Sequence, residues 1–211
     1  MKIHYFDIYA RAEGARMLLG HAKQPFENVY YTQETWPAFK ATGKLDFNQL
    51  PALELPDGRL IVQSNSIVRY LGRLYGYYPE DDVYTAWRID STFDVVDDFI
   101  NQFGKYSWEN DEARKAVAKE GFYKWFPTWL ASIEKRLLAN TSQKYIVGDK
   151  QTIADIALDT QIFNKFFNEA HKDYAELQAA IAPFEVFTAY VKAQKEELAE
   201  YLAARPQPRS F

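Results

Sequence analysis

Residues 49–64 read QLPALELPDGRLIVQS, and this stretch decides the fold of the N-terminal part of the chain. Its two largely apolar segments, Gln49–Leu55 and Arg59–Gln63, have the composition of short strands. Between them, Pro56-Asp57-Gly58 supplies the backbone angles that a tight reversal needs. The stretch therefore predicts a β-hairpin that ends where the next element begins, at Ser64.

An amphipathic helix is expected directly after the hairpin. Its apolar residues recur at helical spacing, at Ile67, Val68, Leu71 and Leu74. Either Ser64 or Asn65 is a suitable N-cap. A helix N-terminus presents unpaired N–H groups and the positive end of the helix dipole, which together favour a bound carboxylate. We therefore expect an anionic ligand to bind at Ser64.

The segments before the hairpin alternate between strand and helix character. Lys2–Tyr9 and Glu27–Tyr31 are rich in β-branched and aromatic residues, whereas Arg11–Lys23 carries apolar residues at helical spacing. Trp36–Ala41 suits a short helix. The order β-α-β-α-β-β-α predicts a mixed sheet with helices packed on it, in an α/β domain over residues 1–76.

An all-α domain is predicted for the rest of the chain. Gly, Pro and acidic residues mark a linker at 77–82, and residues 83–211 show helical periodicity alone. One apolar seam runs from Ile89 to Phe103, and a second runs from Phe122 to Leu137. Pro127 lies inside the second seam and is expected to kink that helix.

A third helix of this domain is expected to begin after Thr152. Thr152 and Asp155 have the spacing of a capping box, with Asp in the place usually taken by Glu. The apolar residues that follow, Ile156, Phe163 and Phe167, are expected to be buried. The closing segment Arg205–Phe211 cannot continue a helix past its prolines and should lie across the surface.

The composition excludes several classes of function. The chain has 211 residues, of which 47% are hydrophobic and 26% charged, as is typical of a globular protein. A net charge of −4 without a basic block argues against nucleic acid or an anionic membrane as a partner. No apolar run has the length of a membrane span or a secretory leader, so a cytoplasmic location is expected. Because cysteine is absent, any reacting thiol must come from a ligand.

Taken in order, these motifs resemble those of the cytosolic glutathione S-transferases over essentially the whole chain. The motifs are Tyr5-Phe6, Arg11-Ala12-Glu13, Gln49-Leu50-Pro51, residues 63–71 (QSNSIVRYL), Val147-Gly148-Asp149-Lys150 and Thr152–Leu158. The first two, with Arg205-Pro206-Gln207, look like the sigma class of tyrosine-type enzymes, whereas Leu45-Asp46-Phe47 looks like the mu class. The resemblance implies a thioredoxin-like N-terminal domain, a homodimer and conjugation of glutathione to small hydrophobic electrophiles. Glutathione would be a co-substrate, and no cofactor is expected.

Tyr5 is the residue to which the resemblance assigns catalysis. A free thiol, with a pKa of about 8.5, is mostly protonated at neutral pH. A phenol O–H that donates a hydrogen bond to the sulfur favours the thiolate, and each pKa unit corresponds to about 1.4 kcal/mol. Taken alone, Tyr5 would be an ordinary core aromatic of a strand, but its neighbours favour the catalytic role. Tyr9 is the nearby rival.

The resemblance also implies a glutathione site. An extended peptide pairs with a backbone whose N–H and C=O both point outward, and Leu50 suits this role if the bond to Pro51 is cis. Gln63 and Ser64 would hold the γ-glutamyl carboxylate, with Gln49 nearby. Trp36 and Lys40 would meet the glycyl carboxylate. The expected glutathione-binding residues are Tyr5, Arg11, Trp36, Lys40, Gln49, Leu50, Pro51, Gln63, Ser64 and Asp98.

Acidic residues of the first long helix have two interpretations. The resemblance implies that Asp98, or alternatively Asp97, of a second subunit contacts the γ-glutamyl ammonium; a solvated helix face is the ordinary alternative. Asp94, Asp97 and Asp98 at a dimer axis would also attract a divalent cation, but one short stretch offers too few oxygen ligands, so no metal is expected. Phe47 would insert into the partner subunit or make a plain loop contact.

The pocket for the electrophile is the least defined part of the site. Its expected liners are Ile8, Tyr9, Phe103, Tyr106 and Phe211. Prostaglandin D synthases of the family carry a tryptophan where an ungapped count here reaches Lys105, which argues against that specialisation. Ala10 and Asn48 stand where the family commonly has glycine, and Tyr9 where it has arginine, so the shape of the pocket departs from the family pattern.

Two other functions stay open beside conjugation. The same thiolate would serve a glutathione-dependent peroxidase or isomerase, which differs only in the pocket for the second substrate. A non-catalytic, crystallin-like relative with the same fold is the alternative from a different class.

Overall fold

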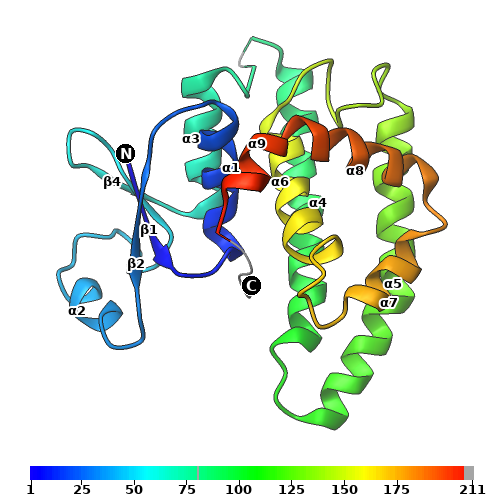
Figure 1. Cartoon of the computed structure of the whole chain (residues 1–211), viewed down its shortest axis with the longest axis horizontal. Helices are drawn as coiled ribbons and strands as arrows, with labels where there is room; N and C mark the ends of the chain where they lie inside the picture. Colours follow the sequence, from blue (N-terminus) through cyan, green and yellow to red (C-terminus); the bar gives the residue numbers. More distant parts are fainter. Residues whose placement is uncertain (80, 207–211) are drawn as a thin grey trace.

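Two parts of different make-up lie side by side: a small β-sheet with its helices, and a set of long helices (Figure 1). The structure is a computed structural model and describes residues 1–79 and 81–206. The predicted α/β domain followed by an all-helical domain is confirmed. Between the two parts, the last helix of the first ends at Tyr75 and the first helix of the second begins at Val83. The exact domain limits stay a prediction.

The N-terminal part has the predicted β-α-β-α-β-β-α order. Its elements are β1 (Lys2–Phe6), the 3₁₀ turn η1 (Ala10–Ala12), α1 (Glu13–His21), β2 (Glu27–Tyr31), α2 (Trp36–Lys40), β3 (Ala52–Glu54), β4 (Leu60–Val62) and α3 (Ser64–Tyr75). The sheet has the order β2-β1-β3-β4, in which β1 runs parallel to β2 and antiparallel to β3. The carboxyl end of β1, where Tyr5 lies, therefore meets the start of the hairpin near Ala52.

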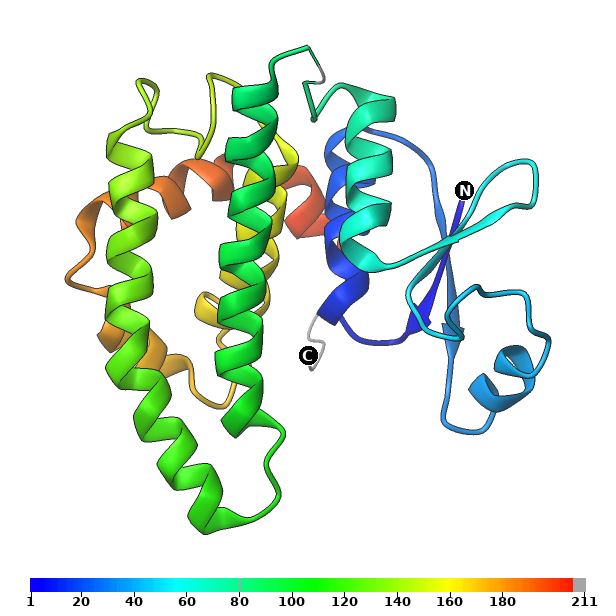
Figure 2. The same ribbon diagram turned by 180° about the vertical axis from the view of Figure 1, so that it is seen from behind.

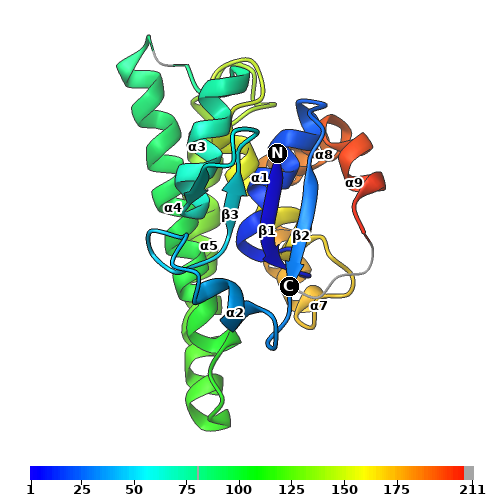
Figure 3. The same cartoon turned by 90° about the vertical axis from the view of Figure 1, so that its left-hand side faces the viewer.

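The alternation of side chains along β1 divides the sheet into two faces. Ile3 and Tyr5 belong to the main core with α1 and α3. On the opposite face, the imidazole of His4 stacks on Phe39 of α2 with 5.5 Å between ring centroids. Figure 3 shows α2 standing apart from α1 and α3, across the sheet. The face that carries Tyr5 is therefore the one turned toward the helical part.

The helical part is built around two long helices. Its elements are α4 (Val83–Ser107), α5 (Glu112–Leu138), α6 (Ile153–Gln161), the π-helical turn η2 (Ile162–Phe166), α7 (Tyr174–Ile181), α8 (Glu185–Glu197) and α9 (Ala199–Ala204). Figure 2 shows α4 and α5 side by side, with α6 behind them. Pro127 lies within α5, and the predicted capping box of Thr152 and Asp155 opens α6. Ile156 and Phe163 are buried as expected, and Phe167 is half-buried.

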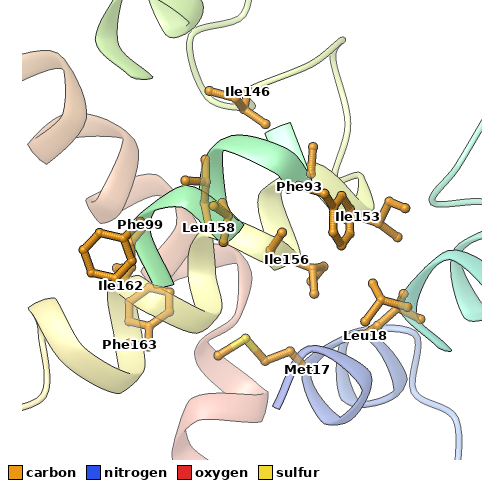
Figure 4. Packing of buried hydrophobic residues seen from close by; sticks show 14 of the residues in the cluster. Met17, Leu18, Phe93, Phe99, Ile146, Ile153, Ile156, Leu158, Ile162 and Phe163 are labelled. Atoms are coloured by element: carbon orange, nitrogen blue, oxygen red, sulfur yellow. The ribbon is translucent and has the colours of Figure 1, made fainter. Parts of the chain in front are cut away.

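The central helix α6 joins the two parts through a continuous apolar core. It packs against α1, α3 and α4. Figure 4 shows Met17 and Leu18 of α1 turned toward Ile156 of α6, and Phe93 of α4 beside Ile153. A Cβ atom at Gly72 of α3 would lie only 2.6 Å from the Ile153 side chain, so glycine is what allows this close approach. This packing joins the α/β part to the helical part.

One predicted detail of this region is wrong. The N-cap of α3 is Gln63, with φ of 72° and ψ of 109°, rather than Ser64 or Asn65. Its backbone turns directly from strand β4 into the helix, so the helix begins one residue earlier than a Ser cap would allow. As a result, Ser64 and Asn65 stand in the first turn of α3, where their side chains face the cavities described below.

Candidate functional site

A cleft of about 570 Å³ lies at the carboxyl end of β1, between α2, the hairpin and the start of α3. We call it the peptide cleft. It is lined by Phe6, Arg11, Trp36, Lys40, Asn48, Gln49, Leu50, Pro51, Gln63 and Ser64. The structure thus brings together eight of the ten residues that the resemblance assigns to glutathione; Tyr5 and Asp98 are the exceptions. Among these described lining residues, Arg11 and Lys40 are cationic and none is acidic, which suits a ligand with carboxylates.

The backbone around the cleft has the features that an extended ligand requires. The Leu50–Pro51 peptide bond is cis, as predicted. Asn48 has a φ of 50°, in the left-handed region, which explains why glycine is common there and why asparagine is a tolerated replacement. The amide of Gln63 donates a hydrogen bond to the side chain of Gln49 at 3.1 Å, which links the two ends of the hairpin.

The hydroxyl of Tyr5 lies beside the backbone of Arg11, a residue that lines this cleft. Tyr5 is only 7% exposed, and its hydroxyl accepts a hydrogen bond from the backbone N–H of Arg11. Burial raises the pKa of Tyr5 above its ordinary value, although the Arg11 hydrogen bond and the charges of Arg11 and Arg16 act in the opposite direction. The phenol therefore stays protonated at neutral pH and keeps an O–H to donate.

A buried arginine fixes the turn that carries this arrangement. Nε of Arg16 donates to the Asn28 side chain at 2.8 Å, and Nη1 donates to the Ile8 carbonyl at 2.8 Å. The guanidinium also lies 5.9 Å from the centroid of the Tyr5 ring. Arg16 thus links the loop after β1 to helix α1, and its guanidinium packs against the ring of Tyr5.

A second cavity, the interdomain cavity, adjoins the peptide cleft. It is lined from the N-terminal part by η1, α1 and α3, and from the helical part by α4, α6, η2 and Trp108. Its lining is mostly apolar, and its volume is about 90 Å³. Arg11 and Ser64 line both cavities. Tyr5 itself lines neither cavity, but its hydroxyl contacts the backbone of Arg11, which lines both.

Two aspartates of α4, Asp97 and Asp98, differ in burial and in whether they line a cavity. Asp97 lines the interdomain cavity, and its Oδ2 accepts a hydrogen bond from Nδ2 of Asn65 at 2.8 Å. Burial raises the pKa of Asp97, while this hydrogen bond lowers it. Asp98, the residue preferred from the sequence, is exposed and lines neither cavity of its own chain. Its assigned contact with a ligand in a second subunit stays a prediction.

Of the predicted pocket liners, the structure places Phe103 in the interdomain cavity. Tyr9 instead points at the C-terminal segment, where its hydroxyl donates to the Pro206 carbonyl at 2.6 Å. Tyr106 donates to Asp173 at 3.2 Å on another side of α4. Ile8 lines neither the peptide cleft nor the interdomain cavity, and Phe211 lies outside the described residues. Neither Ile8 nor Tyr9 therefore joins Phe103 in the interdomain cavity.

Several cavity residues escaped the sequence reasoning. Trp108 closes one side, and its ring packs so tightly on α4 that a Cβ atom at Gly104 would meet it at 2.7 Å. Gln161 and Lys165 line the wall contributed by the helical part. Trp108 follows the position at which the ungapped count reached Lys105, whereas nothing in the sequence pattern marks Gln161 or Lys165.

Comparisons with known proteins place both parts of the chain in one family. The family model for the glutathione S-transferase N-terminal domain matches residues 1–73, and that for the C-terminal domain matches residues 97–205. Glutathione S-transferase 1 of Ascaris suum is 34% identical over 165 residues, covering 74% of this chain and 76% of the relative. S-crystallin SL11 of Nototodarus sloanii is 27% identical, covering 90% of this chain and 94% of the relative.

A solved structure of a glutathione S-transferase has a similar fold. The glutathione S-transferase Na-GST-3 of Necator americanus, described as monomeric, has a TM-score of 0.80 and 25% identity, with 98% of each chain covered. Within the described residues, no helix is both long enough and apolar enough to cross a membrane. The matches to both domain models, together with the sequence identity to the Ascaris enzyme, show that the chain belongs to the glutathione S-transferase family.

Proposed function

We propose that the protein is a glutathione transferase that binds glutathione in the peptide cleft and conjugates its thiol to electrophiles held in the interdomain cavity. The observation that carries this proposal is the place of the Tyr5 hydroxyl. It bonds the backbone of Arg11, and Arg11 lines both cavities. A sulfur that reaches this junction from the cleft is presented to whatever the second cavity holds.

The chemistry of the cleft supports an extended ligand with a carboxylate at each end. Lys40 and Trp36 of α2 would meet the glycyl carboxylate, and the backbone of Leu50 would pair with the central residue. Ser64, in the first turn of α3, would hold the γ-glutamyl carboxylate with the unpaired N–H groups of that turn. This places the cysteinyl side chain in the middle, toward Tyr5.

The protonated phenol of Tyr5 would donate its hydrogen to the sulfur and so favour the thiolate. The thiol proton leaves to water. The thiolate sulfur then forms a bond to the electrophilic carbon. In conjugate addition the C=C electron pair moves toward the carbonyl and the α-carbon takes a proton from water; in aromatic substitution the halide leaves with the bonding pair. Tyr5 forms no covalent bond in either case.

A Tyr5→Phe variant tests the role of the phenol. Conjugation of chlorodinitrobenzene should fall at least tenfold in kcat, while calorimetry should show nearly unchanged glutathione affinity. Tyr30 pairs with Tyr5 on the neighbouring strand, so Tyr30→Phe removes a comparable hydroxyl as a matched control and should retain activity. Unchanged turnover in Tyr5→Phe would reject Tyr5 as the activator.

A homodimer is the proposed assembly, and the protein is proposed to act in the cytoplasm. Exposed apolar side chains gather on α3 and the start of α4, at Tyr70, Leu74, Val83, Tyr84 and Trp87. Phe47 is 61% exposed and would insert into the partner. Analytical ultracentrifugation should give twice the mass of the chain, and a Phe47→Ser variant should shift the equilibrium toward monomer. A monomeric wild type at all concentrations would reject the dimer.

Peroxide reduction and isomerisation stay as alternatives because they reuse the same thiolate. A non-catalytic role like that of a crystallin is less well supported, since the described cleft retains Tyr5 beside Arg11. Activity assays with hydroperoxides and chlorodinitrobenzene separate these functions.

A further inference from the structure

A buried carboxylate joins the end of helix α9 to the turn that carries Arg11. Glu13, the first residue of α1, is fully buried. Its Oε1 accepts hydrogen bonds from the hydroxyl of Tyr201 at 2.7 Å and from Nη1 of Arg205 at 3.2 Å. Its Oε2 accepts a hydrogen bond from Nη1 of Arg16 at 3.2 Å. One glutamate thus connects residues that lie near the two ends of the chain.

The side chain of Arg205, which is the C-cap of α9, contacts three separate segments. Besides binding Glu13, its Nη1 donates to Oδ1 of Asn164 at 3.0 Å, and its Nη2 donates to the Phe163 carbonyl at 2.8 Å. Its guanidinium lies 4.3 Å from the centroid of the Tyr9 ring. With a side chain only 8% exposed, Arg205 therefore bridges α1, the π-helical turn η2 and the loop after β1.

The loop between β1 and α1 is held on both sides of Arg11. Before Arg11, the carbonyls of Ile8 and Tyr9 accept hydrogen bonds from Nη1 of Arg16 at 2.8 and 3.3 Å. After Arg11, Glu13 is fixed by the hydrogen bonds to its two carboxylate oxygens. These contacts restrict the backbone of the 3₁₀ turn η1, to which Arg11 belongs.

A cluster of this kind contributes little net stability. Its two guanidinium groups and one carboxylate lose most of their water, and replacing a buried ion cluster by apolar side chains is often neutral or stabilising. Within residues 1–79 and 81–206, Nη2 of Arg16 and Nε of Arg205 are buried and have no hydrogen-bond partner, which adds to the cost. We therefore expect the cluster to matter for the geometry of the loop more than for stability.

The hydroxyl of Tyr5 is the group that depends on this geometry. Burial raises the pKa of Tyr5, whereas the hydrogen bond from the Arg11 backbone and the charges of Arg11 and Arg16 lower it. The guanidinium of Arg16 also lies 5.9 Å from the centroid of the Tyr5 ring. A hydroxyl that accepts a hydrogen bond becomes a stronger donor, because successive hydrogen bonds polarise one another. The position of the Arg11 N–H therefore affects how strongly Tyr5 donates to a ligand.

We propose that Arg205 is a positioning residue for Tyr5. Through Glu13 and Arg16 it fixes the turn η1, whose backbone N–H bonds the Tyr5 hydroxyl, and it thereby strengthens the hydrogen bond from Tyr5 to the sulfur of bound glutathione. This inference deepens the proposed transferase function and rests on it. Arg205 acts indirectly, because it lines neither the peptide cleft nor the interdomain cavity.

The pKa of the thiol of bound glutathione tests this role. Arg205→Met removes the guanidinium and should raise that pKa by about half a unit, which lowers the thiolate fraction, and with it kcat below the pKa, by about threefold. The Kd for glutathione, measured by calorimetry, should change by less than about twofold, since the binding contacts remain. Glu200→Gln removes an exposed charge of the same helix and, as the matched control, should change none of these values.

A double-mutant cycle shows whether Arg205 acts through Tyr5. If it does, Arg205→Met should have no further effect on the thiol pKa once Tyr5→Phe has removed the phenol. Equal effects of Arg205→Met with and without the phenol would overturn the inference. So would a thiol pKa that Tyr5→Phe raises and Arg205→Met leaves unchanged.

A spectroscopic measurement on Tyr5 itself separates this inference from the proposed function. In protein labelled with 3-fluorotyrosine, the ¹⁹F resonance of residue 5 is the one that Tyr5→Phe removes, and its titration without glutathione reports the phenol alone. Arg205→Met should raise the pKa of this phenol by about half a unit, because the Arg11 hydrogen bond that lowers it is weakened. A phenol that titrates identically in wild type and Arg205→Met would overturn the inference, whatever the activity.

The remaining outcomes also decide. If Tyr5→Phe leaves the thiol pKa unchanged, the proposed role of Tyr5 in catalysis fails, and the phenol titration alone supports or rejects the positioning by Arg205. If Arg205→Met does not fold, Tyr201→Phe, which removes one hydrogen bond to Glu13, takes its place. A smaller rise of the phenol pKa in Tyr201→Phe then supports the inference, and an unchanged phenol pKa rejects it. If Arg205→Met lowers only the melting temperature, Arg205 is merely structural and the inference fails.

Discussion

Asn65 donates a hydrogen bond to Asp97 across 2.8 Å, joining the first turn of α3 to the middle of α4. The bond crosses from the α/β part to the helical part at the wall of the interdomain cavity. Hydrogen bonds to a charged acceptor contribute more than those between neutral groups, and Asp97 is half-buried. The pair therefore helps to hold the two parts in the orientation that forms the cavity.

A double-mutant cycle with Asn65→Ala and Asp97→Ala measures this link. Each single change should lower the free energy of unfolding, and the coupling energy should be about 1 kcal/mol. Urea denaturation of the four proteins gives the value. Additive effects of the two changes would show that the contact contributes nothing to stability.

The capping box of α6 is expected to be a major support of the helical part. Asp155 is fully buried and accepts hydrogen bonds from the Ile146 N–H at 2.7 Å, the Thr152 N–H and hydroxyl at 2.9 Å each, and the Tyr190 hydroxyl at 3.1 Å. Asp155→Ala leaves these donors buried without an acceptor. We expect a loss of about 3 to 5 kcal/mol in the free energy of unfolding.

Chemical denaturation of Asp155→Ala checks this value against an exposed control. Asp149→Ala changes an exposed aspartate nearby and should alter stability by no more than about 0.5 kcal/mol. Equal free energies of unfolding for the two variants would show that the capping box of Thr152 and Asp155 does not contribute to stability.

His171 should make the fold sensitive to acid. The side chain is 7% exposed, its Nδ1 accepts the Asp173 N–H at 3.1 Å, and burial lowers its pKa to about 4. Because this folded-state value lies below the unfolded value of about 6.5, the stabilisation is present above about pH 6.5 and is lost as the pH falls toward 4. The loss amounts to about 3 kcal/mol over that window.

Measurement of unfolding free energy against pH for wild type and His171→Gln isolates this effect. The difference between the two proteins should be largest above pH 6.5 and should shrink by about 3 kcal/mol toward pH 4. Parallel curves over the whole window would rule out His171 as the source.

Local signals in the sequence predicted most of the framework. Strand β2 occupies Glu27–Tyr31 as expected, and Pro56-Asp57-Gly58 reverses the chain between β3 and β4. The Thr152 capping box also opens its helix where predicted. Each of these rests on a few adjacent residues whose backbone preferences agree with the final fold, which is why they could be found without knowledge of distant contacts.

The features that the sequence did not predict are backbone conformations and side-chain orientations, which local residue preferences do not determine. Gln63 takes a left-handed backbone at the N-cap of α3, and glutamine has no tendency to signal it. The Tyr9 hydroxyl donates to the carbonyl of Pro206, 197 positions later in the chain, a contact that no local pattern marks. Lys165 faces the cavity from a π-helical turn, which shifts the helical spacing used to read faces.

The central claim is that the protonated phenol of Tyr5 lowers the pKa of the thiol of bound glutathione. The direct measurement is the ultraviolet absorbance of the thiolate in the complex with glutathione, titrated with pH for wild type and for Tyr5→Phe. We predict that the bound thiol of wild type titrates at least about one unit below the pKa of about 8.5 typical of a free thiol. In Tyr5→Phe the pKa should return toward that value. An identical titration of the thiol in the two proteins would contradict the claim.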